Sequence, residues 1–375
     1  MPSEIPFIRP NFPTPEALAA DYRSILSSNW FTNFGPMERR LSAAMAAFVA
    51  DDVSATTSAN GTLALLGAVQ ATLGTGTGLV LMPSFTFVAA AQTVVWTGRR
   101  PLFVDVHPDT WQPDLGSARL ALETAEEPVA GILLANVFGV GNPEIAAWEE
   151  LARQYGVPLV IDSAAGFGSW YSDDERVGAR GACEVFSMHA TKPFAVGEGG
   201  AVVSKDAELV AAVDRFANFG FDAHRASVSL GLNAKLSELS AAIGLRQLPE
   251  LDHRLEQRRK VFGIYRDVLG ADFGFQVNAE RSSLCFASLR CRSAAHKAAV
   301  LDELAAQRVD GRDYYNPPLH RQPYFADTPQ GFAAVDLSTT EDLCERIVSV
   351  PIHDDMADSD IERIVHALSL AGRSS

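Results

Sequence analysis

A single lysine separates an apolar run from a glycine-rich turn in the segment 184-EVFSMHATKPFAVGEGGAVV-203. The apolar residues on either side predict two buried strands, so Lys192 is expected at the end of a buried strand. An amine in that position loses hydration, which disfavours the charged ammonium and makes the lysine a usable nucleophile near neutral pH. Lys192 is therefore the first candidate for covalent chemistry.

A carboxylate follows another apolar run. Asp162 comes directly after 158-PLVI-161, and the carboxyl end of a buried parallel strand is where α/β proteins usually bind ligands. A buried carboxylate needs a cationic or donor partner, and the protonated nitrogen of a pyridine ring is both. The simpler interpretation is that Asp162 caps the next segment.

A helix start offers a possible phosphate site. The segment 56-TTSANGTLALLGA-68 places small polar residues before an alanine- and leucine-rich helix, which leaves backbone N–H groups and a hydroxyl at its positive end. Taken alone, an ordinary N-cap explains this pattern. Together, however, Lys192, Asp162 and 60-NGT-62 meet the three demands of pyridoxal 5'-phosphate: an aldehyde anchor, a ring-nitrogen partner and a phosphate cradle.

Two glycine patterns, 74-GTGTG-78 and 139-GVGNP-143, raise the alternative of a nicotinamide cofactor. The first precedes its strand, whereas the nucleotide fingerprint follows a strand and opens a helix, and the second lacks the third glycine. Loop glycines explain both patterns better.

The elements that must position these residues alternate between strand and helix. Strands are predicted at 79–83, 101–106, 131–137, 158–164, 184–189 and 200–204, and helices at 61–73, 84–96, 142–156 and 205–220. This alternation indicates an α/β fold whose mostly parallel central sheet is covered by helices.

The pattern changes toward the C-terminus. Residues 236–269 form a long helical stretch that Pro249 interrupts, and 358–372 predicts a packed terminal helix. We expect a large cofactor-binding domain at 1–248 and a smaller C-terminal α+β domain at 249–375.

Composition excludes several classes of protein. The formal net charge of −15 argues against a nucleic-acid binder. No apolar run reaches the length of a spanning helix, and the N-terminus resembles no signal or transit peptide. The four cysteines show no metal-site spacing and are expected to be reduced thiols. These features predict a soluble cytoplasmic protein without a metal site or a membrane partner.

The lysine segment resembles the cofactor-lysine motif of the sugar aminotransferase family of the DegT/DnrJ/StrS type. Similar segments extend over nearly the whole chain: 26-LSSNWFTNFGPMERRL-41, 59-ANGTLAL-65, 83-PSFTFVAAA-91, 101-PLFVDVHPDTW-111, 231-GLNAKLSELSAAIGLRQL-248 and 314-YYNPPLHRQPYF-325. The resemblance implies the fold type I aminotransferase architecture and a homodimer with its active sites at the subunit interface.

The same resemblance implies roles for individual residues. Lys192 would anchor pyridoxal phosphate and then move the proton between substrate and cofactor, while Asp162 would keep the pyridine nitrogen protonated. Gly61, Thr62 and Ser187 would hold the phosphate. Phe87 would stack on the ring, and Asn233 would reach the phosphate of the neighbouring subunit.

The sequence also departs from the family pattern. Where D-A-A-Q-A-H-G is common, this chain has 162-DSAAGFG-168, so Ala165 replaces a glutamine, Phe167 replaces a histidine, and a polar contact near the cofactor oxygen is missing. Ala234 and Lys235 replace a frequent tyrosine and arginine. A dehydrating branch of the family has histidine at the position of Lys192, so the lysine disfavours that branch.

The resemblance predicts an aminotransferase that moves an amino group from L-glutamate to a keto group of a nucleotide-linked deoxysugar. The alternatives are amination of a keto-cyclitol, and a non-catalytic regulatory protein that keeps the cofactor as a ligand. Thr32, His189 and His320 are the candidates for substrate contacts. For His320 a turn-capping role is equally compatible with the sequence, and His189 is expected to shape the pocket rather than carry protons.

Overall fold

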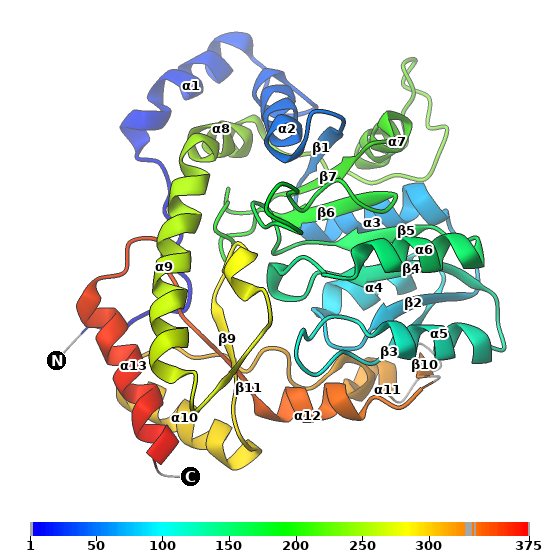
Figure 1. The fold of residues 1–375 in the computed structure, drawn as a ribbon. Helices are drawn as coiled ribbons and strands as arrows, with labels where there is room; N and C mark the ends of the chain where they lie inside the picture. The colour runs from blue at the N-terminus through cyan, green and yellow to red at the C-terminus, as the bar shows by residue number, and fades with distance from the viewer. Residues whose placement is uncertain (1–2, 327–331, 334, 374–375) are drawn as a thin grey trace.

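The computed structural model describes residues 3–326, 332–333 and 335–373. An eight-stranded sheet with the order β1-β7-β6-β5-β4-β2-β3-β10 forms its centre (Figure 1). The strands are β1 (Ser54–Ser58), β2 (Leu79–Pro83), β3 (Arg100–Val104), β4 (Val129–Ala135), β5 (Leu159–Asp162), β6 (Cys183–Ser187), β7 (Gly200–Ser204) and β10 (Phe332–Ala333). β7 runs antiparallel to both of its neighbours and the other pairs are parallel, which confirms the predicted mostly parallel sheet.

Helices cover both faces of this sheet. Side chains alternate along each strand, so that Val80 and Met82 face one layer while Leu79 and Leu81 face the other. The first layer contains α3 (Gly61–Leu73), α4 (Val88–Trp96) and α7 (Ala207–Ala217). The second contains α2 (Pro36–Val49), α5 (Leu115–Thr124), α6 (Ile145–Tyr155) and α8 (Glu238–Gln247), and α1 (Pro15–Ser28) packs beside α8.

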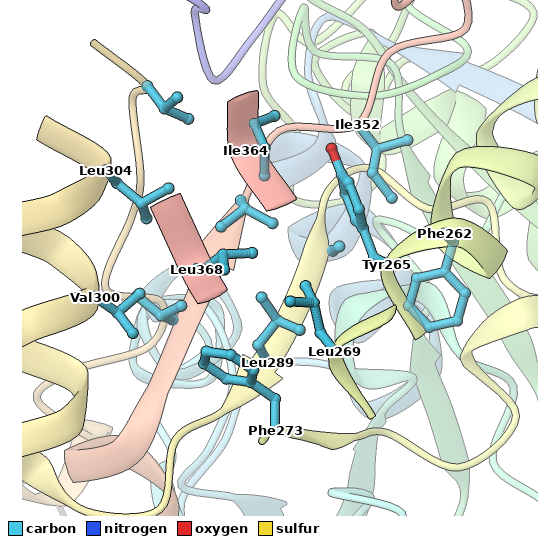
Figure 2. Packing of buried hydrophobic residues seen from close by; sticks show 14 of the residues in the cluster. Phe262, Tyr265, Leu269, Phe273, Leu289, Val300, Leu304, Ile352, Ile364 and Leu368 are labelled. Carbon is cyan, nitrogen blue, oxygen red and sulfur yellow. The ribbon is translucent and has the colours of Figure 1, made fainter. Parts of the chain in front are cut away.

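A second, smaller sheet has the order β11-β9-β8 and is antiparallel. Its strands are β8 (Gly274–Phe275), β9 (Ala287–Arg290) and β11 (Ile347–Val350), and the helices α9 (Leu251–Leu269), α10 (Ala294–Ala306) and α13 (Asp358–Arg373) pack around it. Tyr265, Leu289 and Ile364 are among the buried residues of this core (Figure 2). The remaining helices are α11 (Pro323–Ala326) and α12 (Ser338–Arg346), with 3-10 turns η1 (Val137–Gly139), η2 (Leu248–Glu250), η3 (Ala279–Arg281) and η4 (Leu319–Arg321).

Most predicted elements are present near the expected bounds, and the helical stretch before Pro249 does end in a short turn, η2, before α9 begins. The largest difference at a helix start is in α4, which begins at Val88 rather than near residue 84. The reason is that the backbone carbonyl of Ser84 accepts a hydrogen bond from the Leu319 N–H (3.1 Å), which holds Ser84 outside the helix. Phe87 consequently becomes the N-cap residue of α4.

Each sheet is packed against by a segment from a distant part of the chain. Ile5 bridges Val309 and belongs to the core around the small sheet, although it lies at the N-terminus. Leu319 and Phe325, from the C-terminal third of the chain, pack against the α3 and α4 side of the large sheet. The division between residues 248 and 249 stays a prediction.

The four cysteines are buried and form no disulfide. In the part of the chain that the structure describes, no helix is long and apolar enough to cross a membrane. Among the same residues, no group of three or more His, Cys, Asp or Glu side chains could hold a metal ion.

Candidate active site

Two of the predicted site residues lie at the carboxyl edge of the large sheet. Asp162 is the last residue of β5 and Ser187 the last residue of β6, and these strands are parallel neighbours. The backbone N–H of Ser187 donates to the carbonyl of Ala164 (3.2 Å), so the two strand ends are tied together. This edge is the usual ligand-binding side of an open α/β sheet.

Lys192 lies in a closed loop beyond β6 rather than at the strand end itself. Backbone hydrogen bonds join the two arms of the loop, from Met188 N to Gly199 O (2.8 Å) and from Ala190 N to Gly197 O (2.9 Å). The Lys192 N–H donates to the carbonyl of His189 (2.8 Å), and the lysine side chain is partly buried. The loop therefore holds the lysine in a defined turn.

His189 organises the start of this loop. Its backbone N–H donates to the Ser187 hydroxyl (3.3 Å), and its Nδ1 accepts from the backbone N–H of Thr191 (3.2 Å). The other ring nitrogen, Nε2, lies 3.6 Å from a carboxylate oxygen of Glu198. His189 thus connects β6 to the residues on both sides of Lys192.

A cradle forms where the start of α3 approaches β6. Asn60 caps this helix by accepting from the Leu63 N–H (2.9 Å), so the first backbone N–H groups of α3 stay available. A Cβ at Gly61 would lie only 2.8 Å from the Cβ of Ser187 and 3.0 Å from its Oγ. Glycine at 61 therefore lets the helix start and the Ser187 hydroxyl share one small space, with Thr62 exposed beside it.

Asp162 is a buried carboxylate, and it lies near the charge of Lys192. Its Oδ1 accepts from the Ala164 N–H (3.0 Å), while no residue in the described ranges forms a hydrogen bond with Oδ2. Burial raises the pKa of Asp162 above its ordinary value, and the Ala164 N–H and the charge of Lys192 lower it. A protonated pyridine nitrogen at Oδ2 would offset the effect of burial and favour the ionised carboxylate.

Aromatic side chains line the neighbouring wall. Phe87 is 57% exposed, and its ring centroid lies 6.2 Å from that of Tyr315. Tyr315 in turn stacks on Phe138, with centroids 5.2 Å apart and an interplanar angle of 24°. Tyr315 comes from the loop before η4, so this wall joins two distant parts of the chain.

A buried network of hydrogen bonds around Glu184 includes Ser163, the residue that follows Asp162. The carboxylate of Glu184 accepts hydrogen bonds from the hydroxyls of Ser163 (2.6 Å) and Tyr171 (3.1 Å). Its other oxygen accepts from the backbone N–H groups of Gly178 (2.7 Å) and Arg180 (3.1 Å). Despite these donors, burial raises the pKa of Glu184 to about 7.

The two departures from the family pattern in the segment after Asp162 have different surroundings. Phe167 is buried and packs against Phe194 in the lysine loop, with ring centroids 4.9 Å apart. Ala165 is partly buried, and its carbonyl accepts hydrogen bonds from the hydroxyl of Ser283 and, weakly, the thiol of Cys285. The ring at 167 therefore supports the loop of Lys192 from the core.

Three other candidates either lie apart from these residues or already form hydrogen bonds with other side chains. His320 makes hydrogen bonds through both ring nitrogens, to the Ser84 hydroxyl (2.7 Å) and to Glu341 (2.9 Å). Thr32 lies partly buried in the bend between α1 and α2. Asn233 is exposed, and its side-chain oxygen accepts from Lys235 (2.7 Å).

The residues present fit pyridoxal phosphate. The cradle at Gly61 and Ser187 suits its phosphate, the open oxygen of Asp162 suits its ring nitrogen, and Lys192 lies close enough for its charge to act on Asp162. A mostly parallel sheet with such a set at its carboxyl edge defines a fold type I, pyridoxal-phosphate-dependent aminotransferase.

Comparison with known proteins assigns the chain within that class. Residues 14–369 match the DegT/DnrJ/EryC1/StrS aminotransferase family, and the chain belongs to it. A protein of Mycobacterium tuberculosis (strain H37Rv), Protein Rv3402c, is 56% identical over 98% of this chain and 90% of its own length. The dTDP-4-amino-4,6-dideoxy-D-glucose transaminase of Shigella dysenteriae is 29% identical over 96% of this chain and 97% of its own.

A solved structure agrees with the fold. The crystal structure of a putative PLP-dependent aminotransferase from Bacillus cereus superposes with a TM-score of 0.90 at 31% identity, covering 98% of this chain and 100% of the other. The family, the fold and the cofactor class expected from the sequence are thereby confirmed. The roles of the individual site residues stay predictions.

Sequence reasoning missed Glu184 and did not single out Tyr315. Glu184 stands inside the lysine segment, at the start of a predicted strand, and a charged residue within a buried strand is a signal that could have revealed the network. Tyr315 stands in 314-YYNPPLH-320, which resembles the family, but its approach to Phe138 and Phe87 depends on long-range folding.

Proposed function

We propose that this aminotransferase moves the amino group of L-glutamate to a keto group on a nucleotide-linked deoxysugar. The observation that carries the proposal is the convergence of Asp162, Lys192 and the Gly61–Ser187 cradle at one sheet edge. The dTDP-sugar named for the Shigella relative supports the acceptor class. The donor is proposed because glutamate is the amino donor that the family resemblance implies.

Each residue of the set would have a defined role. The amine of Lys192 would anchor the cofactor and, once released, would move the proton from the substrate carbon to the cofactor carbon. Asp162 stabilises the proton on the ring nitrogen, because its buried carboxylate requires a cation. Backbone N–H groups at the start of α3, with the Thr62 and Ser187 hydroxyls, bind the phosphate. When bound, pyridoxal phosphate supplies an electron sink for the charge that proton removal leaves.

The proposal includes a homodimer whose subunits share the active sites. The hairpin from Phe219 to Leu232 extends from the body of the molecule after α7 (Figure 1). It exposes apolar side chains, including Val228 (61%) and Leu230 (60%), and Asn233 follows it directly. An exposed apolar hairpin is typical of a protein–protein contact, so Asn233 is proposed to reach the phosphate site of the partner.

The first test is the absorption spectrum of the purified protein before and after addition of L-glutamate. The band of the lysine-bound cofactor is expected to give way to the shorter-wavelength aminated form, with release of 2-oxoglutarate. Lys192→Ala should lose the lysine-bound band. Lys205→Ala is the matched control, because Lys205 is exposed and paired with Asp52 (2.9 Å), and it should keep the band. A cofactor band that is insensitive to glutamate would contradict the proposed donor.

A second test separates the acceptors. The aminated enzyme is mixed either with a keto-deoxysugar attached to a nucleoside diphosphate or with a free keto-cyclitol, and return of the lysine-bound band is followed. Rapid return only with the nucleotide-linked sugar is expected. Return with the free cyclitol alone would replace the proposed acceptor by the cyclitol alternative.

A further inference from the structure

Ala165 leaves one side of the site without a polar side chain. Its position is fixed by close packing, because a Cβ on Gly139 would lie 2.1 Å from the carbonyl oxygen of Ala165. Phe138, the residue before Gly139, is therefore directly beside the segment that follows Asp162. The backbone beside Phe138 thus adjoins the edge of the site at which Ala165 lies.

Tyr315 lies against Phe138 on this side of the site. Its ring is stacked on Phe138 at a centroid distance of 5.2 Å, and it meets the ring of Phe85 at 5.7 Å. On the open side its neighbour is Phe87, at 6.2 Å, which is the residue expected to stack on the cofactor ring. Tyr315 thus lies between the proposed ring-stacking residue and the edge where Ala165 contributes no polar group.

The hydroxyl of Tyr315 is available as a donor. Within the described residues it makes no hydrogen bond, although the side chain is partly buried. Burial, together with the nearby charge of Asp162, holds the pKa of Tyr315 well above its usual value. The phenol therefore stays protonated at neutral pH and needs an acceptor.

We propose that the Tyr315 hydroxyl donates a hydrogen bond to the phenolic oxygen of bound pyridoxal phosphate and so supplies the polar contact that Ala165 lacks. The inference rests on the proposed site for this cofactor and is independent of which ketone is aminated. Tyr315 is brought to the site from the loop before η4, whereas the family pattern places its glutamine in the loop after β5.

The proposal has a direct chemical consequence. The phenolic oxygen of pyridoxal phosphate is next to the ring position that carries the lysine linkage. This oxygen and the lysine nitrogen therefore compete for one proton. A donor to that oxygen stabilises its anionic form and lowers the proton affinity of the lysine–cofactor linkage. Removal of the donor must raise that proton affinity.

The test is a spectrophotometric pH titration of the holoenzyme. In Tyr315→Phe, which keeps the ring and removes the hydroxyl, the proton affinity of the linkage is expected to rise about tenfold, as for loss of one charge-assisted hydrogen bond. Tyr314→Phe is the matched control, because Tyr314 stacks on Tyr315 (5.8 Å) but contacts Phe7 and Phe286 on its other sides. That control should titrate as the wild type.

Two results would overturn the proposal. If Tyr315→Phe titrates as the wild type while the KM for a substrate rises, the phenol contacts substrate instead of the cofactor. If both tyrosine variants shift the titration equally, the effect comes from packing of the aromatic wall. Failure of the proposed site itself is distinguishable, because the wild-type protein would then show no lysine-bound band to titrate.

Discussion

Gly61 lies so close to Ser187 that a Cβ on residue 61 would be 2.8 Å from the Cβ of the serine and 3.0 Å from its hydroxyl oxygen. Gly61→Ala is therefore expected to push the start of α3 away from β6 and to fill the space proposed for the phosphate. We expect affinity for pyridoxal phosphate to fall at least about tenfold, the cost of one lost charge-assisted contact. Fluorescence titration of the apoenzyme with the cofactor measures it.

The control for this prediction is Gly263→Ala. Gly263 lies inside α9, and a Cβ there would meet nothing within 4 Å. This variant should bind the cofactor as the wild type does and gain about 0.5–1 kcal/mol of stability from helix propensity. Unchanged cofactor affinity in Gly61→Ala would show that the phosphate binds elsewhere.

Replacing Phe167 by the histidine of the family pattern is expected to destabilise this chain. The phenyl ring packs against Phe48 (5.1 Å), Phe186 (5.2 Å) and Phe194 (4.9 Å), where an imidazole would find an apolar environment. Phe167→His should cost at least about 2 kcal/mol in the free energy of unfolding. Urea denaturation measures it, with Phe12→His, at an exposed position, as the neutral control. Equal stability of Phe167→His and the wild type would mean that the imidazole finds polar partners there.

The sequence predicts the frame of the site because the frame depends on local patterns. Apolar runs locate the strands, and parallel strands bring residues such as Asp162 and Ser187, which stand at their carboxyl ends, to one edge. The cap at Asn60 is also a local signal, since its side chain bonds to Leu63 only three positions later.

The remaining features depend on contacts between distant segments. Tyr315 reaches Phe138 only because the chain returns from the small sheet to the large one. The start of α4 is set by the contact of Ser84 with Leu319, which propensity does not encode. The family pattern indicates a lost polar contact at Phe167, whereas its ring is part of the core.

Stability is expected to fall as the pH rises from 4.5 to about 7 because of Glu184. Burial raises the pKa of this carboxyl to about 7 from an ordinary value of 4.5. The folded state then binds the proton more tightly than the unfolded state, so the favourable contribution is complete below pH 4.5 and is lost as the pH approaches 7. The loss amounts to about 3 kcal/mol.

Glu184→Gln removes this titration, because the amide is neutral at every pH. Urea unfolding between pH 5 and 8 is expected to give a flatter stability profile for the variant than for the wild type. Glu123→Gln, on the exposed side of α5, should keep the wild-type profile. Parallel profiles for Glu184→Gln and wild type would mean that the carboxylate remains ionised throughout this range.

The proposed dimer can be tested through the hairpin that precedes Asn233. Val228→Asp combined with Leu230→Asp would place charges on the two most exposed large apolar side chains of this hairpin, which are 61% and 60% exposed. Burial of those charges at an interface is unfavourable, so we expect the dimer dissociation constant to rise at least about 100-fold in sedimentation velocity experiments. Val268→Asp, on the exposed side of α9 at 55% exposure, should leave the dimer intact.

The same double variant also tests whether the subunits share the site. If Asn233 binds the phosphate of the partner, dissociation removes that contact, and cofactor affinity should decline as the protein is diluted below the dimer dissociation constant. The wild type and Val268→Asp should show no such dependence over the same concentrations. A monomeric double variant that binds pyridoxal phosphate as tightly as the wild type would mean that each subunit builds its phosphate site alone, from Gly61, Thr62 and Ser187.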